Sequence, residues 1–239
     1  MRTAEAAGFD SVSVADHLTQ VPAIGPVESE VLEAYTTLGF VAAHTSRVEL
    51  LTVVSAVTLR HPRYLVESVR TLDRLSGGRA WLGVGAAWNE AEHRAFGIPF
   101  PPIGARLALV EEAVRLCRAS GGPPVMIGGS GERGTLRLVA RHADACSVHP
   151  PFELERKLDV LRRLCEAEGR DYDAIRRTCM VLLDVRDRDR VRALVARLRT
   201  LAAAGIDVVI GDVPDIDRIR PLEIIGREVI PAIAGLGRA

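Results

Sequence analysis

The stretch Val125-Met-Ile-Gly-Gly-Ser-Gly-Glu-Arg-Gly134 starts with an apolar run, continues with small residues and enters a helical pattern that extends to His142. A short apolar run before turn residues is typical of a buried strand. Glycine permits positive φ and lets another group approach the backbone closely. The stretch therefore predicts a strand–turn–helix unit. Its turn either closes on Ser130 as a helix cap or holds an anion such as a phosphate.

Units of this kind recur along the chain. Short apolar or β-branched runs alternate with segments of 3.6-residue periodicity, which is the pattern of β-α units with parallel strands. The predicted strands are Ser11–Ala15, Val48–Val54, Ala80–Val84, Val125–Ile127, Ala145–His149, Thr178–Val185 and Val208–Ile210. The predicted helices are Arg2–Ala7, Val31–Thr45, Pro62–Ser76, Glu90–Phe96, Arg106–Arg118, Glu132–His142, Glu153–Gly169 and Asp189–Ala204, with a helical tail after Pro214.

Two α/β architectures fit this order, a doubly wound sheet and a TIM-type (β/α)8 barrel whose first strand is missing. The barrel explains more, because it gathers the turn residues that follow the strands on one face. Those residues are Asp16–His17, Ser55, Gly85–Asn89 and Gly128–Gly131. Barrel active sites lie on that face. No repeat or linker divides the sequence, so we expect one domain over residues 1–239.

Composition excludes several function classes. The 239 residues carry no net charge, so no electrostatic footprint points to nucleic acid or an acidic membrane. No apolar run reaches the length of a membrane span, and the start has no signal-peptide core. The four cysteines are widely spaced without a CxxC motif, which favours reduced thiols over a disulfide framework or zinc site. These features predict a cytoplasmic protein that acts on small molecules.

Two strand ends carry candidate chemistry. Asp16 and His17 close the first strand, and a histidine there can exchange a proton near neutral pH, although such a pair can also simply cap a strand. Gly83–Glu90 leaves space for a flat ligand with Asn89 as a polar anchor, or for close packing of helix on strand. Glu92 and His93 look superficially like metal ligands, but no second ligand group accompanies them, so no metal is expected.

The order of these stretches resembles a known superfamily. Ala6–Ser11 leads to Asp16-His17, and Arg60–Pro62, Leu72–Arg79, Leu82–Trp88 and Pro124–Gly131 follow in the same order as in the bacterial luciferase-like superfamily. The likeness is to its deazaflavin (coenzyme F420)-dependent oxidoreductases in particular, and it runs over nearly the whole chain. It implies a luciferase-type barrel that binds F420, or alternatively FMN, at the carboxyl ends of its strands.

The resemblance also implies roles for individual residues. Asp16 and His17 match residues beside the reactive ring, with His17 as proton donor or acceptor. Val53 and Val54 match a strand end that often contains a non-prolyl cis peptide, and Ser55 lies just beyond. Further cofactor contacts are implied for Ala86, Ala87, Asn89, Gly128, Gly129, Ser130 and Gly131. The last four match the loop that cradles the cofactor phosphate. The implied reaction is hydride transfer between the deazaflavin and a small organic substrate.

Two departures from the family keep alternatives open. Relatives start earlier, with a first strand and most of the first helix, and they carry a longer segment where this chain has Ala119–Gly122. The alternatives are an FMN-dependent luciferase-like monooxygenase and a degenerate, non-catalytic barrel that serves as a binding subunit. Because relatives are often dimers, the apolar helix Thr36–Ala43 is a candidate homodimer interface.

Overall fold

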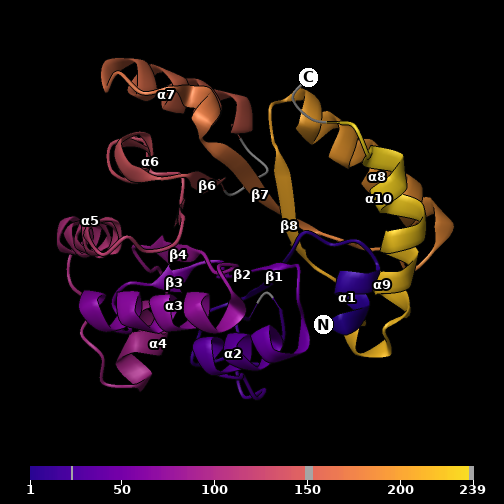
Figure 1. The fold of residues 1–239 in the computed structure, drawn as a ribbon, viewed down its shortest axis with the longest axis horizontal. Helices are drawn as coiled ribbons and strands as arrows, with labels where there is room; N and C mark the ends of the chain where they lie inside the picture. The colour runs from indigo at the N-terminus through magenta and orange to yellow at the C-terminus, as the bar shows by residue number, and fades with distance from the viewer. Residues whose placement is uncertain (23, 149–152, 237–239) are drawn as a thin grey trace.

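The strands of the molecule run parallel in one curved arrangement with helices on its outside (Figure 1). The computed structural model describes residues 1–22, 24–148 and 153–236. β1 (Ser11–Val14) pairs with β2 (Glu49–Thr52). A second ladder has the order β3 (Ser55–Ala56), β4 (Leu82–Gly85), β5 (Val125–Gly128), β6 (Ala145–Val148), β7 (Arg176–Leu182) and β8 (Val208–Asp212). A parallel bridge between Leu50 and Ala80 joins the two ladders.

The helices follow the strands in the expected alternation. They are α1 (Arg2–Ala6), α2 (Ala34–His44), α3 (Pro62–Ser76), α4 (Glu90–Ala95), α5 (Ile103–Ala119), α6 (Thr135–His142), α7 (Leu154–Ala167), α8 (Arg188–Ala203), α9 (Arg220–Ile224) and α10 (Ile230–Ile233). A π-helical turn, Ile225–Val229, joins the last two, and 3₁₀ turns lie at Tyr172–Ala174 and Ile216–Arg218. The predicted strands and helices are confirmed in type; His149, at the end of one predicted strand, lies outside the described residues.

Local signals explain where the helices start and stop. α3 has Pro62 in its first turn, where a missing N–H costs nothing, and it ends at Gly77 with a left-handed φ of 72°. The predicted start of α5 at Arg106 was wrong, because the helix begins at Ile103 directly after Pro102. Pro102 stands at the N-cap, where its missing N–H removes no helical hydrogen bond. α6 begins at Thr135 rather than at Glu132, since Gly129–Gly134 is not helical.

The core lies on both sides of the strands. The outer cluster, between the strands and helices α2 to α7, contains fully buried Leu38, Leu65 and Leu82. A second cluster packs α8 and the C-terminal helices against β7 and β8. The inner cluster consists of Leu51, Trp81, Met126, Ala145 and Ile210, with Val53 and Val54 against it. Each fully buried large aliphatic side chain contributes roughly 1.5–3 kcal/mol of transfer free energy, so burial on both faces holds the strands in place.

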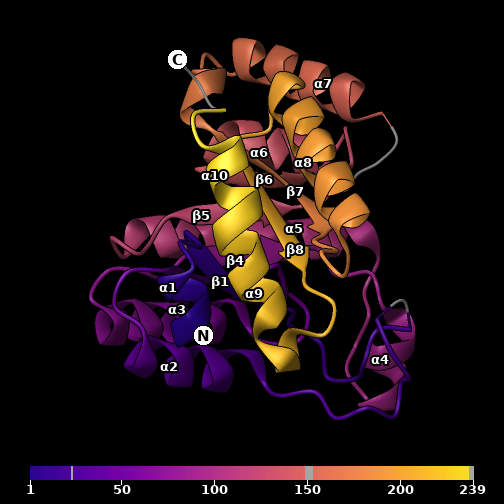
Figure 2. The ribbon, with the colours of Figure 1, turned by 90° about the vertical axis from the view of Figure 1, so that its right-hand side faces the viewer.

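β1 and β8 are the two ends of the strand order. Among the described residues no ladder joins them, and a cavity of about 480 Å³ lies between them, lined on its two sides by Val12, Val14 and Val209. In Figure 2, α9 and α10 cross in front of β8. The hydrogen-bonded order therefore runs from β1 to β8 without closing. The strand predicted over Val48–Val54 is β2, which ends at Thr52, whereas β3 (Ser55–Ala56) lies beyond the predicted range.

The structure bears on two expectations from the sequence, one about membrane-spanning helices and one about the cysteines. Within residues 1–22, 24–148 and 153–236, no helix combines the length and hydropathy that a membrane crossing requires. Cys117, Cys146, Cys165 and Cys179 are free and buried. Burial raises the pKa of Cys117 and Cys179 to about 11 and that of Cys146 to about 12, which disfavours the reactive thiolate. The cytoplasmic location stays a prediction.

A carboxylate on α1 fastens that helix to the turn before β2. The Glu5 carboxylate accepts hydrogen bonds from the backbone N–H groups of Arg47 at 2.6 Å, Ser46 at 2.9 Å and Val48 at 3.1 Å. These bonds, led by that of Arg47, lower the pKa of Glu5 from 4.5 to about 2. The ionised form is therefore the one that the folded protein prefers.

Replacing Glu5 by glutamine should lower the free energy of unfolding at pH 7. Because the pKa of Glu5 is lower in the folded than in the unfolded protein, its contribution is fully present above pH 4.5 and is lost as the pH falls toward 2. The difference between wild type and Glu5→Gln, measured by urea unfolding, should shrink across that window. A difference that stays constant from pH 7 to pH 2.5 would show that ionisation of Glu5 is irrelevant to stability.

Candidate active site at the carboxyl ends of the strands

Three strand ends meet at Val54. A Cβ atom added to Gly85 or to Gly128 would lie 2.7 Å from the Val54 Cγ2 atom, so both positions require glycine. The Val53–Val54 peptide is cis, as the family resemblance implied. Gly85 and Gly128 are also direct partners in the β4–β5 register. The ends of β2, β4 and β5, which the sequence separates widely, therefore come together around one side chain.

His17, just after β1, is held by a carboxylate from α4. Its Nδ1 atom lies 3.0 Å from Oε2 and 3.2 Å from Oε1 of Glu92, whose side chain is 1% exposed. The Trp88 ring packs edge-on against the His17 ring with a centroid distance of 5.5 Å. Trp88 itself is 63% exposed. The His17 ring is thus fixed on one nitrogen and partly open to solvent.

Asp16 forms a buried ion pair. Its carboxylate is almost inaccessible and accepts a hydrogen bond from Arg60 Nη1 at 2.6 Å, while Arg60 Nη2 contacts Glu33 at 2.5 Å. The guanidinium also lies over the Tyr35 ring. Burial alone lowers the pKa of Arg60, but Asp16 and Glu33 outweigh burial and raise it above its ordinary value. Asp16 therefore links the segment after β1 to the first residues of α2 and α3.

Ser55 is fully buried behind the same strand end. Its hydroxyl group pairs with the Tyr35 hydroxyl at 2.8 Å and with Thr52 Oγ1 at 3.0 Å. Burial raises the pKa of Tyr35 to about 12, so the phenol stays neutral. Through these two hydrogen bonds, Ser55 supports the strand end that carries Val54.

The loop after β4 is held in one conformation by Arg106. Ala87 has a φ of 61°, and Arg106 Nη1 donates to the carbonyl oxygens of Ala86 at 2.9 Å and Ala87 at 2.8 Å. Asn89 caps α4, because its side chain accepts a hydrogen bond from the Glu92 N–H at 3.2 Å. Ala86 and Ala87 are half-buried, so the loop presents small side chains beside Val54.

The backbone of the loop after β5 is shaped by Gly129. Gly129 has a φ of 123° and donates to Ser147 across the strands. Within the part of the chain that the structure describes, the backbone N–H groups of Ser130 and Gly131, and those of Glu132 and Arg133 after them, donate to no protein group. The alternative in which Ser130 caps the helix is contradicted, because α6 starts after Gly134 without a side-chain cap. The loop suits an anion.

The charges next to this loop balance one another. Glu132 contacts Arg156 Nη1 at 2.6 Å and Lys157 Nζ at 2.7 Å, and the hydrogen bond from Lys157 is the main cause of a lowered pKa of Glu132. Arg156 also pairs with Glu153 at 2.8 Å, so two carboxylates face two cations and the cluster has no net charge. The suitability of the loop for an anion therefore rests on its backbone N–H groups.

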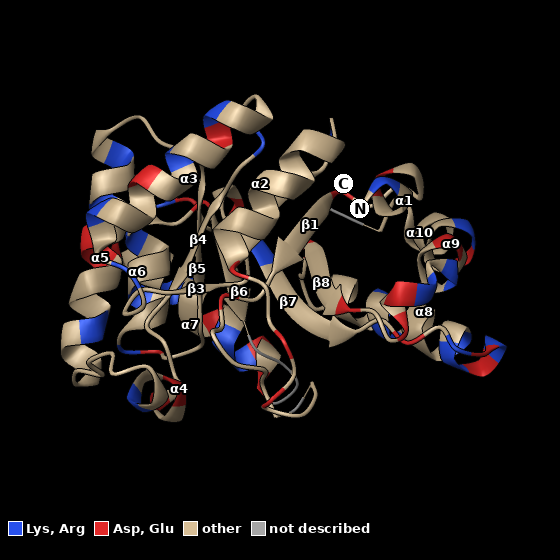
Figure 3. Ribbon diagram, turned by 90° about the horizontal axis from the view of Figure 1, so that it is seen from below, with Lys and Arg blue, Asp and Glu red and all other residues tan. Residues whose placement is uncertain are grey.

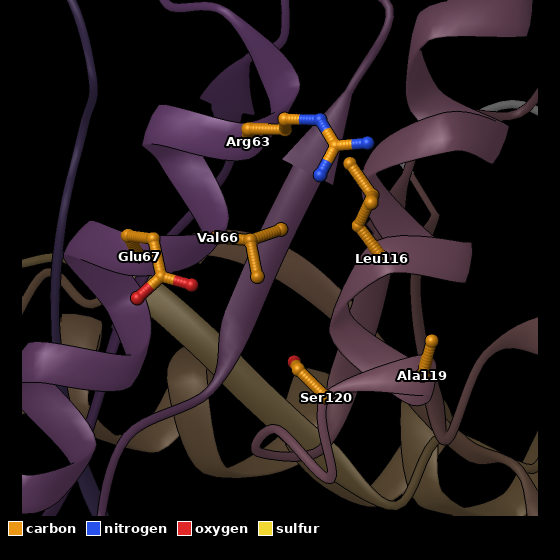
Figure 4. Close-up of a pocket in the computed structure, with 6 residues that line it drawn as sticks. All are labelled: Arg63, Val66, Glu67, Leu116, Ala119 and Ser120. Carbon is orange, nitrogen blue, oxygen red and sulfur yellow. The ribbon is translucent and has the colours of Figure 1, made fainter.

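The described cavities lie elsewhere. One, of about 330 Å³, lies between α3 and α5 on the outer surface and is lined by Arg63, Val66, Glu67, Leu116, Ala119 and Ser120 (Figure 4). Neither this cavity nor the one between β1 and β8 is lined by a predicted site residue. The candidate site is therefore defined by the strand ends. No cluster of three or more metal-ligating side chains occurs in the described ranges.

A match to a family model decides the family. Residues 1–208 match the model described as luciferase-like monooxygenase. The chain belongs to this family. Membership confirms the predicted luciferase-like barrel and identifies the chain as an oxidoreductase of this type. A relative from Kineococcus radiotolerans, an F420-dependent glucose-6-phosphate dehydrogenase, is 32% identical over 223 residues, which cover 80% of this chain and 64% of the relative.

Solved structures show the same fold at low sequence identity. An F420-dependent secondary alcohol dehydrogenase in complex with an F420-acetone adduct superposes with a TM-score of 0.81 at 18% identity, covering 97% of this chain and 92% of its own. A riboflavin lyase with modified FMN and riboflavin gives a TM-score of 0.67 at 17% identity, covering 85% and 60%. Both support the barrel architecture.

Several important residues were not assigned to the site from sequence. From the sequence, Glu92 resembles only a weak metal ligand, and the local pattern assigns no site role to Arg106 or Tyr35. Glu92 lies in the first turn of α4, shortly after the glycine-rich end of β4. A carboxylate so close to a strand end can reach the site, and this position is the signal that could have identified it. The partner of Glu92 lies 75 positions away along the chain, so the pair itself is invisible in the sequence.

Removing Arg60 should destabilise the protein by about 3 kcal/mol, because the buried Asp16 carboxylate loses its partner. Asp16→Asn combined with Arg60→Ala should restore part of that loss, since no buried charge then remains unpaired. Chemical unfolding of the two single variants and the double variant gives the coupling free energy. Strictly additive effects would contradict a buried ion pair between Asp16 and Arg60.

Proposed function

We propose that this chain transfers a hydride between the deazaflavin F420 and a small organic substrate. The observation that carries the proposal is the F420-dependent relative that matches 80% of the chain, together with the anion-binding loop after β5. A bound deazaflavin supplies the hydride chemistry, while the protein binds, orients and exchanges protons. In this proposal residues 1–239 act as one barrel domain.

The residues at the strand ends fit such a cofactor. Val54 and the half-buried Ala86 and Ala87 offer a small, apolar surface where a flat ring can lie. The N–H groups of Ser130 and Gly131, which have no partner among the described residues, face a phosphate in the proposal. Asp16 and Ser55 support the site indirectly in this proposal, because the Asp16 carboxylate is paired with Arg60 and the Ser55 hydroxyl group with the Tyr35 hydroxyl group.

His17 is the proposed proton donor or acceptor. Its Nδ1 atom is taken by Glu92, and the structure gives its Nε2 atom no hydrogen-bond partner among the described residues. A histidine with one fixed and one free nitrogen suits proton exchange with a substrate oxygen or nitrogen. Trp88, exposed beside His17, is placed to contact the substrate.

FMN is the second candidate cofactor. The riboflavin lyase with modified FMN shares the fold, and the same loop would hold the phosphate of FMN. In that case the chain is an FMN-dependent luciferase-like monooxygenase. The two candidates differ in the tail beyond the phosphate, so a direct comparison of affinities separates them.

Titration with F420 and FMN in parallel, followed by quenching of tryptophan fluorescence, tests the proposal. F420 should bind saturably and more tightly than FMN, with the exposed Trp88 as reporter. Gly129→Val should weaken F420 binding at least tenfold, because a side chain at φ 123° distorts the loop and its Cβ would contact Thr135 at 3.2 Å.

The matched control is Gly121→Val. Gly121 also has a positive φ, of 60°, but it lies in the turn after α5 with open space around it. This variant should lose comparable stability while keeping its affinity for F420. Preference for FMN would move the chain to the second candidate. Failure of the folded wild type to bind either cofactor would favour a non-catalytic barrel.

We also propose that the chain forms a homodimer through α2 and α3. α2 contains no Asp, Glu, Lys or Arg, and it is tan along its length in Figure 3, whereas α5 and α8 carry many charges. Phe40 on α2 and Tyr64 and Leu75 on the adjacent α3 are 58%, 66% and 73% exposed. A surface of this kind in a chain rich in ion pairs favours burial against a second copy.

Phe40→Glu combined with Leu75→Glu should shift the protein from dimer to monomer. Analytical ultracentrifugation measures the change. Ile103→Glu on α5 is the control, since Ile103 is similarly exposed at 54% but lies outside α2 and α3. A monomeric wild type, or a double variant that dimerises like wild type, would contradict this interface.

A further inference from the structure

Glu92 collects donors from one short segment after β1. Besides His17 Nδ1, its carboxylate accepts hydrogen bonds from the backbone N–H groups of Leu18 at 2.7 Å and Thr19 at 3.1 Å. A buried carboxylate is costly unless hydrogen bonds replace its hydration. Here donors from three consecutive residues do so, the Thr19 hydroxyl group at 3.4 Å among them, and Glu92 itself is held by the Asn89 cap at the start of α4. The segment after β1 and the loop after β4 are therefore joined at one carboxylate.

The contact determines what His17 can do. A carboxylate accepts hydrogen bonds and donates none, so the ring nitrogen that faces Glu92 must carry a proton. In the neutral imidazole, the other nitrogen then has the lone pair. Trp88, packed edge-on at 5.5 Å, restricts rotation of the ring. Together the two neighbours leave Nε2 as the nitrogen that is open to a reacting group.

We propose that Glu92 is the positioning residue that fixes the Nδ1–H tautomer and the orientation of His17. The part of this inference that concerns turnover depends on the proposed hydride transfer, whereas the tautomer is a property of the unliganded protein. As the substrate gives a hydride to the cofactor, Nε2 takes the proton from the adjacent hydroxyl or amino group. In the reverse direction Nε2 returns that proton, so charge and atoms balance.

The test reads the ring nitrogens directly. In protein labelled with ¹⁵N-histidine, the His17 signals are assigned by their loss in His17→Asn. At a pH where the ring is neutral, wild type should show the Nδ1–H tautomer. Glu92→Gln should show the Nε2–H tautomer or a mixture, because the glutamine amide can donate to Nδ1. Glu92→Asp should keep the Nδ1–H form at least in part, since it retains a carboxylate.

Glu90→Gln is the matched control. Glu90 lies in the same first turn of α4, but it is exposed, and among the described residues its carboxylate pairs only with Arg94, at 3.4 Å. Its replacement should leave the His17 signals unchanged. An Nε2–H tautomer in wild type, or unchanged His17 signals in folded Glu92→Gln as judged by near-UV circular dichroism, would overturn the proposal.

Turnover gives an independent readout. In the enzyme loaded with F420, Glu92→Gln should lower kcat by about 100-fold while the Kd for F420 stays within about twofold of wild type, and Glu92→Asp should recover part of the rate. An unchanged kcat would refute the role of Glu92 in turnover. If wild type binds no F420, the proposed function fails, and the nitrogen signals still decide whether Glu92 sets the tautomer.

Discussion

The parallel direction of all strands is the constraint on which the site depends. Apart from the short step from β2 to β3, each connection from one strand to the next contains a helix, so the strands end on the same side of the sheet. Polar residues that follow β1, small residues that follow β4 and β5, and the Val53–Val54 peptide are brought together for that reason alone. The helices cover the outer face of the strands, and the inner cluster around Met126 fills the other face. The carboxyl end is left as the place where polar and small side chains meet.

Two buried carboxylates then tie neighbouring loops to one another at this end. Asp16 holds Arg60 at the start of α3, and Glu92 on α4 holds His17 and the two residues after it. A buried pair gives little net stability compared with an apolar pair of the same shape, but losing one partner is strongly destabilising. The two buried carboxylates therefore provide less stability than apolar pairs would, but they fix the positions of the loops. They hold His17 in place at the edge of the solvent, which apolar packing alone could not do.

The sequence predicted what depends on local chemistry. The limits of α3 were predictable because Pro62 and Gly77 mark its two ends, and Asp16 and His17 stood out because polar residues directly follow an apolar run. The break between β2 and β3 was not predictable, since Val53 and Val54 continue the apolar pattern. The pairing of Glu92 with His17 depends on where α4 lies after the loop of Ala86 and Ala87. That position is set by Arg106, from a third element, and no local pattern encodes it.

The glycines after β4 and β5 show why residue type alone does not identify a ligand site. Gly85 and Gly128 are small because the Val54 side chain lies against them. Their nearest neighbour is protein, and no ligand is needed to explain them. Gly129 differs, because after its φ of 123° the next N–H groups have no partner within the described part of the chain. The capacity to hold an anion thus rests on backbone conformation over residues 129–133. The ion pairs beside the loop do not add to that capacity, because Glu132 and Glu153 balance Arg156 and Lys157.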